Sequence, residues 1–288
     1  MLGKDEAILE GWTTISALAG ATSTAKLGVI HQSNYFRSPG LSAKMIATLD
    51  ALSGGRFILF FDFGRQMREH RNYDLPYPDD VDQRAREALD GLEIIRALWA
   101  ADRPVTMRRG PFAVSDAVCN PNPVQQPHPP VWFGEMEPDL IDATARFGNG
   151  WNTTPVSLPH LDRRLAILRE ACARHNRPFT EIEISVEMQV LIAEDGDVRP
   201  QIRQMLDLAP NPDQIDPQLR AFANGTADTP PSSFTDITIY GSPADVAAGL
   251  QAYIDHGTNH FLLWFLGAPD STDMTLFAER VIPLFRPH

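Results

Sequence analysis

The stretch from Glu10 to Gly64 determines the expected fold. It reads EGWTTISALAGAT (10–22), KLGVIHQSNYFRSP (26–39) and GLSAKMIATLDALSGGRFILFFDFG (40–64). Apolar residues at helical spacing predict helices over 10–22 and 40–53, the second ending at the Gly54-Gly55 pair. The β-rich run 26–31 and the run 56–63 predict strands, and the second is almost continuously apolar, as in a strand covered on both faces.

The rest of the chain continues this alternation of helices and strands, which requires parallel strands joined by right-handed crossovers. We expect about six such strands, near positions 27, 57, 131, 150, 184 and 261, and a small hairpin at 105–114. Residues 1–288 are predicted to form one domain. Prolines interrupt the polar segment 196–235, which is predicted to be an irregular insertion.

Composition excludes several classes of protein. The chain has 288 residues, 43% hydrophobic residues and a formal net charge of −12, which argues against a nucleic-acid or anionic-membrane surface. No apolar run approaches the length of about 20 residues that a membrane span needs. The two cysteines, Cys119 and Cys172, fit neither a disulfide framework nor a metal site, so we expect a cytoplasmic protein without a metal.

Several ordered segments carry a resemblance to a known family. Besides residues 10–64, they are NPNPVQQPHPPVWFG (120–134), ARFGNGW (145–151), YGSPADVAAGLQAYIDHGTNHFLLWF (240–265) and LFAERVIPLFR (276–286). In this order they resemble the bacterial luciferase-like family of FMN- and F420-dependent oxidoreductases. The resemblance implies an α/β fold, a luciferase-like (β/α) barrel of the TIM type.

The chain begins where the second helix of such a barrel is expected. The resemblance therefore implies an incomplete barrel without its first two strands, and without the histidine and acidic groups that relatives carry there. Six strands leave two open edges, which need cover. Because relatives commonly dimerise through their early helices, we expect a homodimer through helices 10–22 and 40–53.

The resemblance also suggests which residues contact a cofactor. His31, Gln32, Ser33 and Asn34 end the third barrel strand, where relatives have a bulge against the flavin. Relatives have a glycine-rich run after the fourth strand, and here only Gly64 remains of it. A glutamate that donates a proton in deazaflavin-dependent relatives is matched by Arg65, which cannot donate one. No catalytic residue is assigned.

Two further cofactor contacts are expected at later strand ends, Gly134 and Asn152. Relatives bind the cofactor phosphate at the helix after Gly134, but this chain places Glu135 and Glu137 there. Two carboxylates at a helix start favour capping of the helix itself and would repel a phosphate.

Other side chains are expected to be structural. His70 lies in a charged segment and is predicted to be exposed, whereas Trp264, Phe57, Phe60 and Phe61 are predicted to lie in the core. No P-loop and no nucleophile–histidine–acid pattern is present in the sequence.

These observations leave two classes of function open. The first is a luciferase-like oxidoreductase or monooxygenase that uses FMN or F420 on a small organic substrate. The second is a flavin-free protein, either a pseudoenzyme that serves as a partner subunit or a barrel repurposed for a flavin-independent reaction. The resemblance favours the first, and the phenylalanines of strand 56–63 with Glu135 and Glu137 favour the second.

Overall fold

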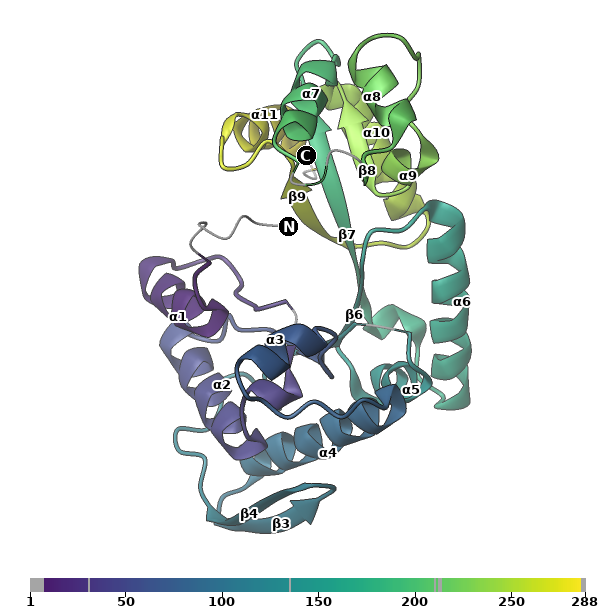
Figure 1. The fold of residues 1–288 in the computed structure, drawn as a ribbon. Coiled ribbons are helices and arrows are strands. Elements are labelled where there is room, and N and C mark those ends of the chain that lie inside the picture. Colours follow the sequence, from purple (N-terminus) through teal and green to yellow (C-terminus); the bar gives the residue numbers. More distant parts are fainter. Residues whose placement is uncertain (1–7, 31, 135, 210, 212–213, 286–288) are drawn as a thin grey trace. The chain divides into compact units, whose positions relative to one another are not determined.

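The computed structural model describes residues 8–30, 32–134, 136–209, 211 and 214–285. Its residues group into two compact units (Figure 1). The N-terminal unit comprises residues 7–151 and 167–182, and the C-terminal unit comprises residues 152–166 and 183–288. Each unit is an α/β structure with parallel strands, which confirms the predicted fold class.

The N-terminal unit has a parallel sheet in the order β1-β2-β5-β6. Its elements are α1 (Gly11–Ala21), β1 (Gln32–Ser33), η1 (Asn34–Phe36), α2 (Pro39–Ser53), β2 (Leu59–Asp62), α3 (Met67–Asn72), α4 (Val81–Ala100), β3 (Val105–Arg109), β4 (Phe112–Ala117), β5 (Val131–Phe133), α5 (Pro138–Phe147), β6 (Gly150–Thr153), α6 (Leu158–Arg174) and η2 (Phe179–Glu181). The chain crosses between the units within β6 and within α6.

The core of this unit lies between its strands and helices α1, α2, α4 and α5. Phe57, Phe60 and Phe61 are buried, as predicted. Helix α2 ends where predicted, because Gly54 adopts the left-handed conformation (φ +67°) that caps the helix. The predicted hairpin is the antiparallel pair β3–β4, which lies against α4 (Figure 1).

The first predicted strand is displaced. Residues 26–30 form only an isolated parallel bridge, Leu27 to Phe57, and the strand itself is Gln32–Ser33. Gly28 explains part of this difference, because the Phe60 ring occupies the space that a side chain at position 28 would need. Residues 8–10 form no strand, and His31 and residues 1–7 lie outside the described part of the chain.

The C-terminal unit has a parallel sheet in the order β8-β7-β9. Its elements are β7 (Glu183–Ile192), α7 (Arg199–Asp207), α8 (Pro217–Ala223), α9 (Ser232–Thr235), β8 (Thr238–Gly241), α10 (Pro243–Asp255), β9 (His260–Phe265), α11 (Thr272–Arg280) and η4 (Ile282–Phe285). Strand β8 brings the parallel strands of the described residues to seven, one more than predicted.

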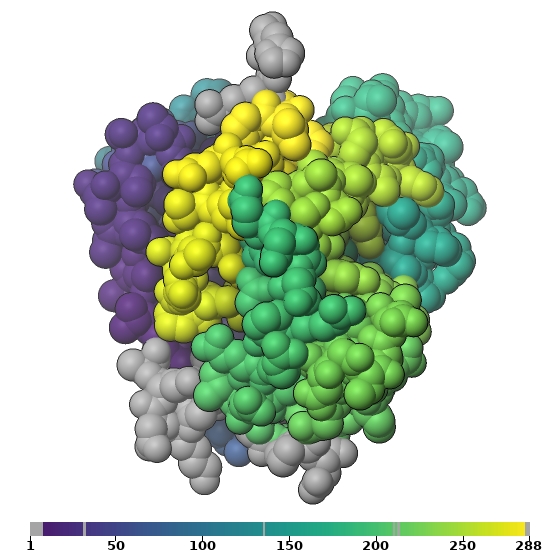
Figure 2. All heavy atoms as spheres, turned by 90° about the horizontal axis from the view of Figure 1, so that it is seen from above, coloured from purple at the N-terminus to yellow at the C-terminus, as the bar shows by residue number. Residues whose placement is uncertain are grey.

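Segment 196–235 is more regular than predicted, because several of its prolines begin helices instead of breaking them. Pro200 and Pro217 occupy the first turns of α7 and α8, where the missing N–H costs nothing. The three short helices share a small core that includes Ile202, Phe222 and Phe234. In Figure 2 the green α7–α9 segment and the yellow α11 lie side by side on one face, consistent with the hydrogen bond from Gln201 to Asp273.

Candidate functional site

Three predicted residues converge at one edge of the N-terminal sheet. Ser33 pairs with Asp62 in the register of β1 and β2, and Phe61 pairs with Phe133 in the register of β2 and β5. Ser33, which ends β1, and Gly64 and Gly134, which follow β2 and β5, therefore lie at the same edge. This is the carboxyl edge of parallel strands, where α/β proteins bind their ligands.

Gly64 forms a buried turn that only glycine can make without strain. Its φ is +81°, and a Cβ there would collide with the Ser33 hydroxyl and lie 3.1 Å from Nε2 of His70. The Asp62 carboxylate holds the turn, because its Oδ1 accepts from the backbone N–H groups of Phe63 at 2.5 Å and Gly64 at 3.3 Å. The chain after β2 is thus fixed in a defined conformation against Ser33 and His70.

His70 is the main functional candidate that the sequence analysis missed. The prediction of an exposed side chain is wrong, because the segment forms helix α3 and leaves His70 only 1% exposed. Its Nε2 lies 2.8 Å from the Ser33 hydroxyl, and its Nδ1 lies 2.8 Å from the Gln66 carbonyl oxygen. The Phe36 ring stacks on the imidazole at 4.7 Å. No local signal predicts this burial, because Ser33 lies 37 residues earlier in the chain.

These contacts restrict the hydrogen-bond roles of His70. A carbonyl oxygen can only accept, so Nδ1 donates to Gln66, which leaves Nε2 to bond the Ser33 hydroxyl. The Ser33 oxygen also accepts from the backbone N–H of Tyr35 at 3.3 Å. The imidazole therefore restricts the orientation of the Ser33 hydroxyl beside Gly64.

Asn34 and Arg65 take different positions. Asn34 is buried against α4, where its amide donates to the Glu87 carbonyl at 3.5 Å and occupies the space left by Gly91. The neighbouring Tyr35 hydroxyl donates to the Glu87 carboxylate at 2.6 Å, and burial together with that carboxylate raises the pKa of Tyr35. Arg65 is exposed, and its carbonyl accepts from the Tyr77 hydroxyl at 3.1 Å.

The start of α5 is acidic but is not capped by Glu137. The side chain of this N-cap residue makes no capping hydrogen bond, and its buried Oε2 has no partner among the described residues. The capping prediction is therefore not met at Glu137, and Glu135 lies outside the described residues. An unpaired carboxylate oxygen disfavours a phosphate at this helix start.

Of the remaining predicted residues, Asn152 belongs to the C-terminal unit. It is buried, and its amide donates to the Glu187 carboxylate at 2.6 Å. Gln32 contributes its backbone to β1, and His31 is outside the described residues. Ser33, Gly64 and Gly134 are therefore the predicted residues that the structure brings together.

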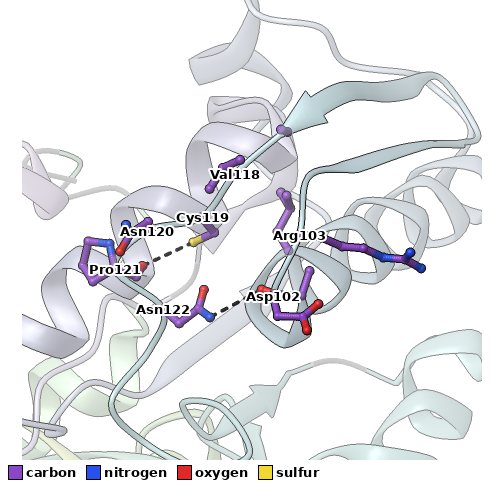
Figure 3. A pocket seen from close by; sticks show the side chains of 10 residues that line it. Asp102, Arg103, Val118, Cys119, Asn120, Pro121 and Asn122 are labelled. Atoms are coloured by element: carbon purple, nitrogen blue, oxygen red, sulfur yellow. Dashed lines mark hydrogen bonds between the residues drawn. The ribbon is translucent and has the colours of Figure 1, made fainter.

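A polar cavity of about 410 Å³ lies elsewhere in the N-terminal unit, between the end of α4 and residues 117–122 (Figure 3). The thiol of Cys119 lies 3.6 Å from the Pro121 carbonyl, and burial raises its pKa. A thiol held in its neutral form is a poor nucleophile. The cavity includes none of the predicted site residues.

Among the described residues, no group of three or more histidine, cysteine, aspartate or glutamate side chains could hold a metal ion. Among the described helices, none has the length and apolar character needed to cross a membrane.

Comparisons with known proteins place this geometry in context. The family model of the luciferase-like monooxygenases matches residues 2–260. The chain is 27% identical, over 94% of its length and 81% of the relative's, to an F420-dependent glucose-6-phosphate dehydrogenase of Kineococcus radiotolerans. It is 29% identical to a phthiodiolone/phenolphthiodiolone dimycocerosates ketoreductase of Mycobacterium bovis, over 60% of this chain and 45% of the ketoreductase. The chain thus spans less than half the length of that relative.

The fold is also similar to solved structures. An F420-dependent secondary alcohol dehydrogenase in complex with an F420-acetone adduct superposes with a TM-score of 0.78 at 20% identity, covering 99% of this chain and 86% of the dehydrogenase. A coenzyme F420-dependent tetrahydromethanopterin reductase from Methanopyrus kandleri superposes with a TM-score of 0.76 at 19% identity, covering 96% and 88%.

Proposed function

Because the chain belongs to the family of luciferase-like monooxygenases, we propose that it is an oxidoreductase that uses FMN or F420 on a small organic substrate. The carboxyl ends of β1, β2 and β5 would hold the cofactor ring. When bound, the cofactor supplies a hydride or activates oxygen. The residues of this chain bind the ring, orient it and exclude water from it.

The convergence of Ser33, Gly64 and Gly134 at the carboxyl edge of the parallel strands is the observation that carries this proposal. The Asp62 carboxylate holds the turn at Gly64 in place. Ser33 presents an oriented hydroxyl beside it, backed by the buried His70. These features fit the ring end of a flavin or deazaflavin.

Among the described residues at this edge, Arg65 and His70 bind and orient rather than transfer protons. Arg65 is exposed after Gly64, and an arginine keeps its charge, so it serves as a countercharge to an anionic ring. His70 donates a hydrogen bond from Nδ1 to a carbonyl and bonds the Ser33 hydroxyl through Nε2, which commits both ring nitrogens.

Absorbance titration of the purified protein with FMN and with F420 tests the proposal. We expect saturable binding of one of them, which Arg65→Glu abolishes by reversing the countercharge. Arg71→Glu is the matched control, because Arg71 is also an exposed arginine but lies on helix α3, where it pairs with Asp79 at 2.8 Å. Absence of binding of both cofactors at millimolar concentration contradicts the oxidoreductase proposal.

A flavin-free partner subunit, or a flavin-independent enzyme, is the second candidate. The unpaired Glu137 oxygen at the start of α5 favours it, because that helix would otherwise receive the cofactor phosphate. If Glu137 is what opposes the phosphate, Glu137→Gln tightens FMN binding. If neither the native protein nor this variant binds FMN or F420, the second candidate replaces the first.

We also propose a homodimer in the cytoplasm. Large apolar side chains are exposed on the two helices expected at the interface, Leu18 on α1 and Leu41 and Leu52 on α2. Burial of such residues is a common driving force for association. Sedimentation at micromolar concentration tests the dimer, and Leu41→Lys with Leu52→Lys should shift it to a monomer. A native monomer at that concentration contradicts it.

A further inference from the structure

The sheet of the C-terminal unit has two faces of opposite character. On one face, the alternate β7 residues Ile184, Val186, Met188, Val190 and Ile192 are all buried. Their β9 neighbours Phe261, Leu263 and Phe265 share that face, and the Phe265 ring packs against Phe277 of α11 at 5.3 Å. Helices α10 and α11 line this apolar side, so it is the structural face of the sheet.

The other face, called here the polar face, carries Ser185, Glu187, Gln189, Thr238, His260 and Trp264. Leu262 lies beside Glu187 on this face, and Leu191 and Tyr240 continue it beyond Gln189. Register places Ser185 beside His260 and Gln189 beside Trp264. The Ser185 hydroxyl lies 2.9 Å from Nδ1 of His260, and the Thr238 hydroxyl donates to the Gln189 amide oxygen at 3.1 Å. Each strand of this sheet therefore contributes hydrogen-bonding groups to the same face.

Several of these polar side chains are buried. Ser185 and Thr238 are almost inaccessible, and Glu187 is 4% exposed with its carboxylate bonded to Asn152. Burial of polar and charged groups costs free energy, and apolar residues of similar size would be at least as stable. A sheet face that keeps such groups is typical of a binding site.

Trp264 breaks the pattern of burial. It was predicted to be a core residue, and that prediction is wrong, because its side chain is 58% exposed at the end of β9. The other four tryptophans, Trp12, Trp99, Trp132 and Trp151, are buried. An exposed indole beside an amide offers a stacking surface and a hydrogen-bond donor at one place.

We propose that the Trp264 end of the polar face binds an uncharged, planar organic ring that carries a hydrogen-bond acceptor. The ring stacks on Trp264, and the acceptor receives a hydrogen bond from the Gln189 amide nitrogen, since the amide oxygen accepts from Thr238. The Glu187 carboxylate lies two residues earlier on the same face, about 7 Å along the strand, and disfavours an anion. That this ring belongs to the substrate rests on the proposed oxidoreductase function.

Binding of acetophenone to the cofactor-free protein tests the site. In protein labelled with 5-fluorotryptophan, we expect the ¹⁹F resonance of Trp264, assigned by its loss in Trp264→Phe, to shift saturably while the four buried tryptophans stay unchanged. Benzoate should not bind, because it is an anion. Phenyltrimethylammonium should bind more weakly than acetophenone, because it has a charge and no acceptor.

Variants separate the two contacts by ligand-observed NMR. Trp264→Ala should weaken acetophenone binding about tenfold by removing the stacking surface. Gln189→Leu should weaken it about fivefold and leave ethylbenzene, which has no acceptor, unchanged. Tyr73→Ala is the control, because Tyr73 is an exposed aromatic residue of the N-terminal unit.

The site is refuted if acetophenone causes no saturable shift at Trp264, if the cation binds more tightly, or if Gln189→Leu has no effect. Failure of the proposed function has a different signature. In that case acetophenone still binds at Trp264, but the protein binds neither FMN nor F420.

Discussion

The two units place their polar groups on their sheets in different ways. In the N-terminal unit, Gly64 forms a buried turn at the strand ends, and the polar side chains beside it, Ser33 and His70, are buried and committed to each other. In the C-terminal unit, side chains from all three strands form hydrogen bonds on one sheet face, and an exposed indole lies at the end of β9. The first arrangement fixes the carboxyl edge proposed to bind the cofactor ring, and the second suits recognition of a ligand by its functional groups.

The difference has a consequence for mutations. Groups of the N-terminal site are part of the structure that holds the strand ends, so their replacement should affect both stability and binding. The Trp264 side chain is largely exposed, so its replacement should affect binding alone. The four predictions below test this contrast.

The largest effect is expected at Gly64. Gly64→Ala forces an alanine into a left-handed conformation and drives its methyl group into Ser33, which should cost about 3 kcal/mol of unfolding free energy. Gly54→Ala is the control, because Gly54 also has a positive φ (+67°) but no atom within 4 Å of its Cβ position. It should cost about 1 kcal/mol. Equal losses for both variants in urea denaturation would show that Ser33 and His70 do not restrict this turn.

Alkaline pH should destabilise the C-terminal unit through Tyr253. The buried Tyr253 hydroxyl donates to the Val156 carbonyl at 2.6 Å, and burial raises its pKa to about 12 from an ordinary 10.0. The folded state keeps this proton longer than the unfolded state, so its stabilising contribution is present below pH 10 and is lost as the pH rises to 12. The loss is about 2 kcal/mol.

Denaturation experiments between pH 9 and 12 measure how steeply the free energy of unfolding falls with pH, which is called the slope below. Tyr253→Phe should make it shallower, whereas Tyr73→Phe, at an exposed tyrosine, should leave it unchanged. An unchanged slope in Tyr253→Phe would mean that the hydroxyl loses its proton equally well in both states.

The Ser33–His70 pair should have the next largest effect on the free energy of unfolding. Ser33→Ala, His70→Phe and the double variant form a thermodynamic cycle in which phenylalanine keeps the stacking on Phe36. We expect a coupling of about 1 kcal/mol, as for a buried hydrogen bond. FMN or F420 titrations of the same variants should show weaker binding in Ser33→Ala. A coupling near zero would mean that the imidazole does not orient the hydroxyl.

The smallest effect on stability is expected at Trp264. Trp264→Phe should change the unfolding free energy by less than about 0.5 kcal/mol, because the side chain is largely exposed. Thermal unfolding monitored by circular dichroism measures this. A loss of unfolding free energy above about 2 kcal/mol would show that Trp264 stabilises the fold by packing. Its replacement would then not differ from replacements in the N-terminal site.

Much of the fold followed from local pattern. Helices α2, α5 and α10 begin at prolines, which favour the first turn of a helix, and Ser242 caps α10 through a reciprocal pair with Asp245. Strand β9, His260–Phe265, includes the predicted position 261. These elements are readable because capping residues, prolines and apolar periodicity act within a few residues of the chain.

The candidate site was predicted less completely. Ser33, Gly64 and Gly134 could be predicted because each ends a strand, and the carboxyl ends of parallel strands meet. The roles of Asn34 and His70 could not, because the groups that bury them come from distant segments: α4 for Asn34, and Ser33 together with Phe36 for His70.

The sequence by itself determined the family, the alternation of helices and strands, and most element boundaries, because each depends on residues close together in the chain. Only the tertiary structure decided that His70 is buried and Trp264 exposed. Local composition suggested the reverse for both, since a charged segment is usually solvated and an apolar strand is usually covered. Burial depends on which segments pack together, and that arrangement is set by contacts between residues far apart in the sequence.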